Sequence, residues 1–339
     1  MKTPKAIRLP SGAWFVRVTV DGQRISITRD TEKEAVAEAV ALKLGVKKAK
    51  TAPETLTLRT AIDRYIDLRS VVLSPSTIRG YRIIQKNRFQ SVMGVPICDV
   101  TDADYQKAIN ADAKKYSGKT LKNSWGFVAS VIKETCGREV SVRLPQVIRN
   151  EKLFLQPDEI PQFVDAIKGT QNEAALLLGL HGLRASEILA VRRCDIDLEA
   201  GTIDVHGAAV PDENNTIVYR NENKNEASRR TVPILIPRLR ELLLENEYEP
   251  DALICGTVCS GALYNAVERA CKKSKLPMVG VHGLRHSFAS LCYHTGVPEA
   301  VTMKLGGWSD PGTMRKIYTH VADKDLKSQA ENLASFFTG

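Results

Sequence analysis

The 339-residue sequence lacks several features that would assign it to common classes of protein. It has no run of about eighteen apolar residues, and its first twenty residues hold no long apolar stretch, which argues against membrane insertion and secretion. Its seven cysteines include no Cys-x-x-Cys pair, and Cys255 and Cys259 lack a second ligand pair at zinc-site spacing. We therefore expect reduced thiols, several of them buried. No Walker-type glycine-rich loop for a nucleotide is present.

Positive charge is what the sequence has in excess. There are 48 lysines and arginines against 39 aspartates and glutamates, a net charge of +9, while the hydrophobic content of 43% is ordinary. This balance favours a polyanionic partner, although a basic surface without a partner is the alternative. The length predicts two or three domains.

The first fifty residues predict a small antiparallel sheet followed by a helix. Residues 13–20 and 24–28 alternate apolar and polar side chains, and Asp21-Gly22 between them is typical of a tight hairpin. Thr31 and Glu34 have the spacing of a capping box, so a helix is expected to follow. The outer strand face carries Arg17, Thr19, Arg24, Ser26 and Thr28. This face is expected either to lie in a DNA major groove or to be solvated.

The pattern changes to helices from Thr57 onward. Apolar residues recur at helical spacing, Ser74-Pro75-Ser76 begins a second helix, and two more are expected from Thr101 and Lys119. The second of these helices carries the cations Arg79, Arg82 and Lys86. The basic segment 138–155 has no clear period, and we interpret it as an interdomain linker.

A second group of motifs begins with Gly-Leu-Arg-Ala-Ser-Glu at 182–187. The glycine ends one helix, Arg184 occupies the corner and Ser186-Glu187 starts the next helix. Arg184 could point into a cleft while Glu187 holds it, although an ordinary salt bridge at a helix start explains the same pattern. Short strands are expected at 202–205, 216–219 and 230–234. Lys224, in the polar connection before the last strand, could reach into a substrate or be solvated.

The richest stretch runs from His282 to His320. It contains His-Gly-Leu-Arg-His at 282–286, Leu-Gly-Gly-Trp at 305–308 and Tyr-Thr-His at 318–320, with short helices expected between them. His282 and His286 have the spacing of a helical zinc pair, but Gly283 stands where the usual glutamate would be. A structural role within the core is a further alternative for these histidines.

Taken together, these motifs closely resemble the tyrosine recombinase family of the phage integrase type. The resemblance rests on the order Arg184, Lys224, His282, Arg285, Trp308, Tyr318 and covers about residues 157–321. The two preceding parts resemble, with less specific patterns, the arm-binding sheet and the helical core-binding domain of integrases. One motif departs from the family: histidine is common in a Leu-Gly-His motif where this chain has Gly307 and then Trp308. Tryptophan is a known family substitute, and the interval to Tyr318 is one residue longer than usual.

The resemblance implies a mainly α-helical, multidomain protein with small β-sheets. Its expected parts are a three-stranded sheet plus helix that binds arm-site DNA (1–50), a helical core-binding bundle (55–137), the basic linker (138–155) and a mixed α/β catalytic domain with a C-terminal helix (156–339). The N-terminal sheet favours an integrase of a phage or integrative mobile element, since simpler recombinases lack it.

The resemblance also implies roles for the residues. Tyr318 would attack the scissile phosphate to form a 3′-phosphotyrosyl link, with Tyr264 and Tyr293 as alternative phenols. Arg184 and Arg285 would bind the non-bridging oxygens, and Glu187 would orient the arginine or the histidine. Lys224 would protonate the departing 5′-oxygen, His282 would exchange a proton with the tyrosine, and Trp308 would donate a hydrogen bond and pack. No cofactor, nucleotide or metal is expected.

The implied partner is double-stranded DNA, at core and arm sites. The amphipathic segment 323–337 is expected to dock either on its own domain or, in a homotetramer on DNA, on a neighbouring protomer. Accessory DNA-bending or directionality proteins and a cytoplasmic, nucleoid-associated location would fit. A topoisomerase of the same chemistry and an inactive DNA-binding regulator are the alternative functions.

Overall fold

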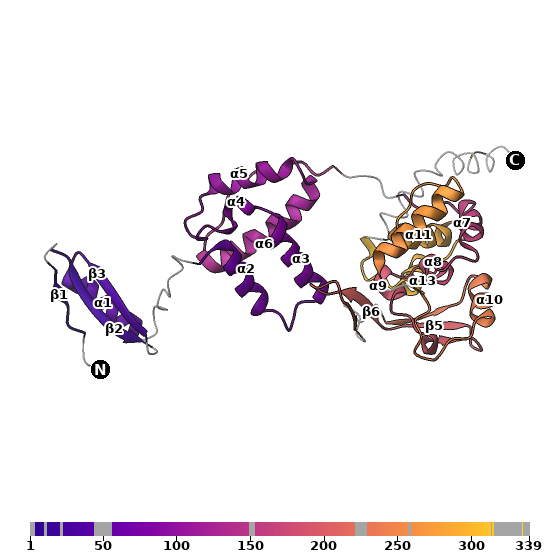
Figure 1. Cartoon of the computed structure of the whole chain (residues 1–339), viewed down its shortest axis with the longest axis horizontal. Coiled ribbons are helices and arrows are strands. Elements are labelled where there is room, and N and C mark those ends of the chain that lie inside the picture. Colours follow the sequence, from indigo (N-terminus) through magenta and orange to yellow (C-terminus); the bar gives the residue numbers. More distant parts are fainter. Residues whose placement is uncertain are drawn as a thin grey trace. The chain divides into compact units, whose positions relative to one another are not determined.

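The computed structural model shows helices interspersed with short antiparallel strands (Figure 1). It describes residues 4–9, 12–20, 23–43, 56–148, 153–220, 229–256, 259–312, 314 and 334. The chain divides into two compact units. The first unit comprises Met1–Leu68 and Ile84–Val147, and the second unit comprises Arg69–Ile83 and Ile148–Gly339.

The chain begins with a three-stranded antiparallel sheet covered on one side by a helix. The strands are β1 (Ile7–Arg8), β2 (Trp14–Val20) and β3 (Gln23–Arg29), in that order, and α1 (Glu32–Lys43) packs on β2 and β3. Val16, Val18, Ile27, Ala35 and Ala39 form the core beneath the helix. The opposite face exposes the five predicted polar residues Arg17, Thr19, Arg24, Ser26 and Thr28. The expected alternation is therefore present.

Five helices follow: α2 (Leu58–Asp67), α3 (Pro75–Asn87), α4 (Gln90–Met93), α5 (Asp102–Ala113) and α6 (Gly118–Cys136). Hydroxyl side chains at Thr57, Thr101 and Ser117 cap α2, α5 and α6 by accepting backbone N–H groups. Trp125 packs edge-on against Phe89 and Tyr105, with centroids 6.0 and 5.4 Å away. The one-turn helix α4 was not predicted. It begins after Phe89, which adopts a left-handed backbone conformation that is uncommon for a residue other than glycine.

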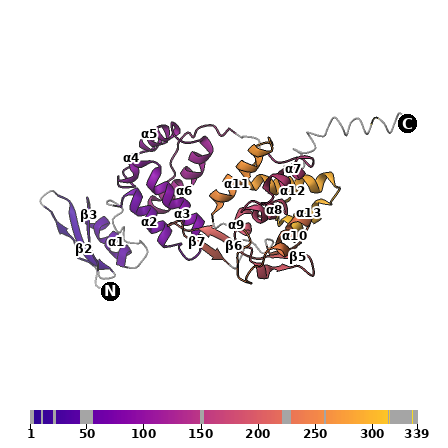
Figure 2. The same ribbon diagram turned by 45° about the vertical axis from the view of Figure 1, so that its right-hand side comes forward.

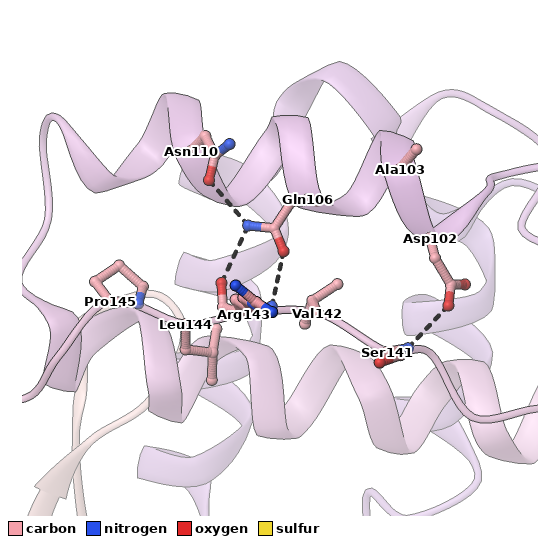
Figure 3. Close-up of a pocket in the computed structure, with 9 residues that line it drawn as sticks. All are labelled: Asp102, Ala103, Gln106, Asn110, Ser141, Val142, Arg143, Leu144 and Pro145. Atoms are coloured by element: carbon pink, nitrogen blue, oxygen red, sulfur yellow. Dashed lines mark hydrogen bonds between the residues drawn. The ribbon is translucent and has the colours of Figure 1, made fainter.

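The segment after α6 has neither helix nor strand from Glu139 to Ile148, and polar side chains of α5 hold part of it (Figure 3). The Gln106 amide donates to Arg143 O at 3.0 Å and accepts from Arg143 N at 2.7 Å. Asp102 accepts from Ser141 N at 2.9 Å and from Arg138 at 2.8 Å, which lowers the pKa of its carboxyl. These contacts line a shallow cavity of about 650 Å³.

The second unit contains the remaining elements, most of which are labelled in Figures 1 and 2. Its helices are α7 (Glu159–Ile167), α8 (Glu173–Leu180), α9 (Ala185–Ile188), the 3₁₀ helix η2 (Arg193–Asp195), α10 (Pro237–Glu245), α11 (Ser260–Lys273), α12 (Val281–His294) and α13 (Glu299–Gly306). Its strands are β4 (Ile196–Asp197), β5 (Thr202–Val205), β6 (Ala208–Pro211), β7 (Ile217–Arg220) and β8 (Arg230–Pro233). They form an antiparallel sheet β4-β5-β8 and a hairpin β6-β7.

Helix α8 is the centre of the second unit. All eight of its residues are buried, and α12, α10, α7, α9 and α11 pack around it. A helix apolar on every side belongs in a core, which is why its sequence shows no amphipathic period. β4 and β6 were not predicted; β4 has two residues, and β6 begins after Gly207, where no alternation is visible.

The predicted fold class, mainly α with small sheets, is confirmed. Among the described helices, none combines the length and apolarity needed to cross a membrane.

Candidate active site

The corner between α8 and α9 fixes Arg184 at the start of a helix. Gly182 adopts a left-handed φ of +83°, and a Cβ there would come within 2.7 Å of the Phe288 ring, so glycine is needed. Arg184 is the N-cap residue of α9, and Glu187 returns its side chain to the Arg184 backbone N–H at 2.8 Å. The same carboxylate accepts from Arg184 Nη1 at 2.5 Å. The predicted corner and its Arg184–Glu187 pair are therefore both present.

A further arginine, Arg230 at the start of β8, completes the surroundings of Glu187. Its Nη1 and Nη2 donate to the two Glu187 oxygens at 3.3 and 3.0 Å, and its side chain is only 6% exposed. Burial alone would raise the pKa of Glu187, but the hydrogen bonds and charge of Arg230, followed by those of Arg184, lower it. Arg230 was not predicted as a site residue. The available signal was its spacing from Val232, since alternate residues of a strand share a face.

The end of α13 and the turn after it accept hydrogen bonds from Arg184 and Arg230. Arg184 Nη2 donates to Gly307 O at 2.5 Å, and Arg230 Nε donates to Leu305 O at 2.7 Å. Gly307 has a φ of +68°, and a Cβ there would lie 2.8 Å from Arg230 Nη1. A Cβ on Gly306 would lie 1.8 Å from the Trp308 ring. The glycine pair is thus required by the close approach of one arginine and one indole.

Arg285 lies on α12 and is buried beneath Trp308. Its guanidinium carbon is 4.0 Å from the Trp308 ring centroid, its Nη1 donates to Gly182 O at 2.5 Å, and the residue is 1% exposed. Among the described residues, its Nε–H has no hydrogen-bond partner. Burial lowers the pKa of Arg285 to about 9; the positive charge of Arg184 adds to this effect and that of Glu187 opposes it. Trp308 in turn stacks on Phe288, with an interplanar angle of 7°.

His282 occupies the first turn of α12 and is exposed. Its ring lies edge-on to that of His286, with centroids 4.5 Å apart. Arg285 follows three residues later, so the two residues are neighbours on the helix surface, about one turn apart. Within the described part of the chain, no group of three His, Cys, Asp or Glu side chains is arranged to hold a metal ion.

The structure brings together Arg184, Glu187, Arg285 and Trp308 of the predicted site, with His282 one helical turn from Arg285. The predicted nucleophile Tyr318 and the predicted acid Lys224 lie outside the described residues, as does the helix expected at 323–337 apart from Ala334. Their positions therefore stay predictions.

The three cations of α3 that were predicted to contact DNA are among the described residues. Within the second unit, Arg79 donates to Asn215 Oδ1 at 3.0 and 2.7 Å, and Arg82 pairs with Glu213 at 3.3 Å. Lys86 is exposed. Two of these three predicted DNA-contacting cations thus have polar protein partners.

The arrangement is suited to an anion. Three guanidinium groups, those of Arg184, Arg230 and Arg285, gather around the carboxylate of Glu187, so these four groups together are cationic. Arg184 is the most accessible of the three, with 33% of its side chain exposed. A buried excess of positive charge is costly unless an anion is brought to it, and planar guanidinium groups match the oxygens of a phosphate.

Comparison with known proteins identifies the family. The family model described as "Phage integrase family" matches residues 153–325. The chain is 25% identical over 345 residues to the integrase of Staphylococcus phage L54a, covering 84% of this chain and 96% of that one. It is 27% identical over 267 residues to a XerC-like tyrosine recombinase of Caldanaerobacter subterraneus, covering 69% and 68%.

Solved structures share the fold. The Tn1549 transposon integrase, in complex with a circular intermediate DNA, superposes with a TM-score of 0.63 at 18% identity, over 82% of this chain and 99% of that one. A lambda integrase tetramer bound to a Holliday junction gives a TM-score of 0.56 at 16% identity, over 93% and 95%. Since the family model matches half of the chain, the chain belongs to the phage integrase family, the site-specific tyrosine recombinases.

Proposed function

We propose that this protein cuts and rejoins double-stranded DNA through a 3′-phosphotyrosyl link to Tyr318, integrating or excising a mobile element. The observation that carries the proposal is the cationic cluster around Glu187, in which Arg285 is buried with an Nε–H that lacks a partner among the described residues. A buried donor of this kind requires an acceptor. The phosphodiester of DNA has the charge and the oxygen atoms to supply it.

In the proposed reaction, Arg184 and Arg285 bind the two non-bridging oxygens of the scissile phosphate. Negative charge builds up on these oxygens when the phosphorus becomes five-coordinate. Donors held ready in a site that excludes water stabilise such charge by about 3–4 kcal/mol each. Glu187 keeps Arg184 at the helix corner, and Trp308 covers the Arg285 guanidinium and offers its indole N–H.

The covalent step exchanges one phosphate ester for another. The Tyr318 oxygen bonds to phosphorus as the bond to the 5′-oxygen breaks, the phenolic proton passes to His282, and Lys224 gives a proton to the departing oxygen. A free phenol has a pKa of about 10, so it needs this help near neutral pH. Because the tyrosyl ester keeps the bond energy of the phosphodiester, a 5′-hydroxyl from another duplex can reverse the step. The reaction therefore needs no nucleotide or metal.

The DNA would be held by several parts of the chain. The exposed face of β2 and β3 would read arm sites, with Arg17 and Arg24 as its cations. Arg79, Arg82 and Lys86 of α3 would contact core-site phosphates. The relatives include a transposon integrase bound to DNA and a lambda integrase tetramer on a Holliday junction. By analogy we infer a homotetramer on DNA in which the segment 323–337 docks between protomers, with accessory bending or directionality proteins.

A suicide substrate tests the proposal directly. DNA nicked beside the crossover loses a short fragment after cleavage, so the covalent intermediate accumulates. We expect a protein–DNA adduct that survives denaturant and that Tyr318→Phe abolishes, while this variant still binds the same DNA. An adduct of normal yield in Tyr318→Phe would show that another residue is the nucleophile. Cleavage that stops in EDTA and returns with added metal would contradict the metal-independent mechanism.

Deletion of residues 1–50 tests the reading of arm sites. The truncated protein should lose its arm-site footprint and keep a weak core-site footprint. Unchanged footprints at both kinds of site would remove the arm-binding role from the N-terminal sheet. The helix and sheet form their own small core, so the deletion should leave the remaining elements intact.

A further inference from the structure

Arg230 lies where three elements of the site meet: the start of β8, the first turn of α9 and the end of α13. We infer that Arg230 is a positioning residue for strand cleavage, which acts as the counter-ion of Glu187 and so leaves Arg184 available for the scissile phosphate. This inference rests on the proposed function and adds a role that the family resemblance does not supply.

Arg230 and Arg184 have different roles because they contact the Glu187 carboxylate differently. Arg230 donates to both Glu187 oxygens, whereas the Arg184 side chain donates to Oε1 through Nη1. Arg230 is 6% exposed and Arg184 is 33% exposed. The carboxylate therefore has a buried partner that balances its charge, and the more accessible guanidinium is not needed for that purpose.

Arg230 also holds the turn that carries Trp308. Its Nε donates to Leu305 O at 2.7 Å, and its Nη1 is 2.8 Å from the point where a Cβ on Gly307 would lie. Arg184 Nη2 donates to Gly307 O of the same turn at 2.5 Å. Movement of Arg230 would therefore be passed to the indole that covers Arg285.

The contacts assign Arg230 a positioning role and not a direct one. Its Nε, Nη1 and Nη2 are all directed to protein oxygens, and its side chain is almost fully enclosed. A phosphate at Arg184 would thus meet Arg230 only through Glu187. Loss of Arg230 should weaken the chemical step more than the affinity for DNA.

Removing Arg230 should also change how Glu187 titrates. Burial raises the pKa of this carboxyl, and the hydrogen bonds and charge of Arg230 are the largest opposing influence. Without them, Glu187 would become protonated as the pH falls toward the acidic range and would release Arg184. The variant should therefore lose activity on acidification over a range in which the wild-type Glu187 stays ionised.

The experiment measures single-turnover adduct formation on a suicide substrate, together with the Kd for the same DNA, from pH 5.5 to 8. We expect Arg230→Met to react at least about tenfold slower at an unchanged Kd, with a further loss toward low pH relative to wild type. Arg230→Lys, which keeps the charge but lacks the planar fork, should recover part of the rate. In the Arg230→Met background, Glu187→Gln should abolish the added acid dependence.

Arg238→Met is the matched control. Arg238 is also a largely buried arginine of the second unit, 15% exposed and 2.6 Å from the buried carboxylate of Glu173, but it touches neither Glu187 nor the turn. Its loss should lower the melting temperature without altering the pH profile of adduct formation. If Arg230→Met reacts at the wild-type rate, or reacts more slowly without any added loss toward low pH, the inference is wrong.

A second measurement keeps the inference separate from the proposed function. The ¹³C resonance of the Glu187 carboxyl, identified by its absence in Glu187→Gln, can be titrated in the DNA-free protein. Its pKa should rise in Arg230→Met and stay low in Arg238→Met; an unchanged pKa would overturn the inference whether or not the protein cleaves DNA. A wild-type protein that forms no adduct would instead contradict the proposed function.

Discussion

The second unit contains two buried arginine–glutamate clusters with opposite balances of charge. Around Arg238, three carboxylates share one guanidinium: Glu173 at 2.6 Å, Glu241 at 3.3 Å and Glu245 at 2.9 Å. Around Glu187, three guanidinium groups gather about one carboxylate. Hydrogen bonds, first from Glu173, raise the pKa of the Arg238 guanidinium, whereas burial and neighbouring cations lower that of Arg285.

The difference distinguishes a structural ion-pair network from the proposed phosphate-binding site. The surplus carboxylates beside Arg238 belong to Glu241 and Glu245, which are 60% and 55% exposed, so water stabilises them. The surplus cations beside Glu187 include Arg285, which is 1% exposed. Water cannot stabilise that charge, so the second cluster is suited to an anion.

Removing the buried carboxylate of each cluster should lower the free energy of unfolding by different amounts. Glu187→Ala leaves Arg230 buried without its counter-ion and should cost about 3–5 kcal/mol. Glu173→Ala leaves Arg238 with two other carboxylates and should cost about 1–2 kcal/mol. Urea unfolding followed by ¹⁹F NMR of fluorotryptophan at position 308 reports on this unit. Equal losses in the two variants would mean that the clusters do not differ as described.

Removing an arginine from each cluster should change the rate of covalent adduct formation by different amounts. Arg184→Ala and Arg285→Ala should bind DNA yet form the covalent adduct at least about a hundredfold slower, because each removes a preorganised donor. Arg238→Ala, at a temperature where it is folded, should react at a rate close to that of wild type. Normal cleavage by either Arg184→Ala or Arg285→Ala would show that the phosphate is bound elsewhere.

The corner before Arg184 contains a buried, neutral histidine, His181, which lies between Glu173 and Glu187 in the sequence. His181 is fully buried, bonds to Leu177 O through Nδ1 at 2.7 Å, and accepts from Leu235 N through Nε2 at 3.0 Å. Burial lowers its pKa to about 4. Because the folded value lies below the unfolded value of about 6.5, its contribution is present above pH 6.5 and is lost as the pH falls toward 4, by about 3 kcal/mol in all.

Stability curves of wild type and His181→Gln measure this contribution. The wild type should lose more stability between pH 6.5 and 4.5 than His181→Gln, since glutamine does not titrate. Parallel curves would show that His181 is not buried in the neutral form.

The smallest expected effect concerns the glycine beside Arg230. Gly307 and Gly169 have similar left-handed φ values, +68° and +73°, but a Cβ on Gly169 meets nothing within 4 Å. Gly169→Ala should cost about 1 kcal/mol through backbone strain alone. Gly307→Ala should cost about 2 kcal/mol, because the new methyl group also displaces Arg230, and should slow cleavage. If both variants cleave normally, Arg230 does not hold the turn.

Sequence patterns predicted the elements whose side chains follow a regular period. The alternation in β2 and β3 placed Val16, Val18 and Ile27 inside and five polar residues outside, as observed. Thr101 at the start of α5 and Gly182 after α8 were likewise predicted at helix ends, as observed. Elements of two to four residues, such as α4 and β4, were missed because they are too short to show a period.

The candidate site was predicted as a set of residues but not as a network. The corner motif gave Arg184 and Glu187, and the motifs of α12 and the following turn gave Arg285 and Trp308. Arg230 escaped because it stands beside Arg229 in a basic run, where nothing in composition separates a buried arginine from an exposed one. Its role depends on contacts with Glu187 and Leu305, which are 43 and 75 residues away in sequence.

The central claim is that the cationic cluster holds a DNA phosphate for attack by one phenol. Mass spectrometry of the trapped adduct, after digestion with protease and nuclease, tests it most directly. We predict a nucleotide remnant on the peptide that contains Tyr318. A remnant on Tyr264 or Tyr293, or a denaturant-stable adduct on a residue other than tyrosine, would contradict the account.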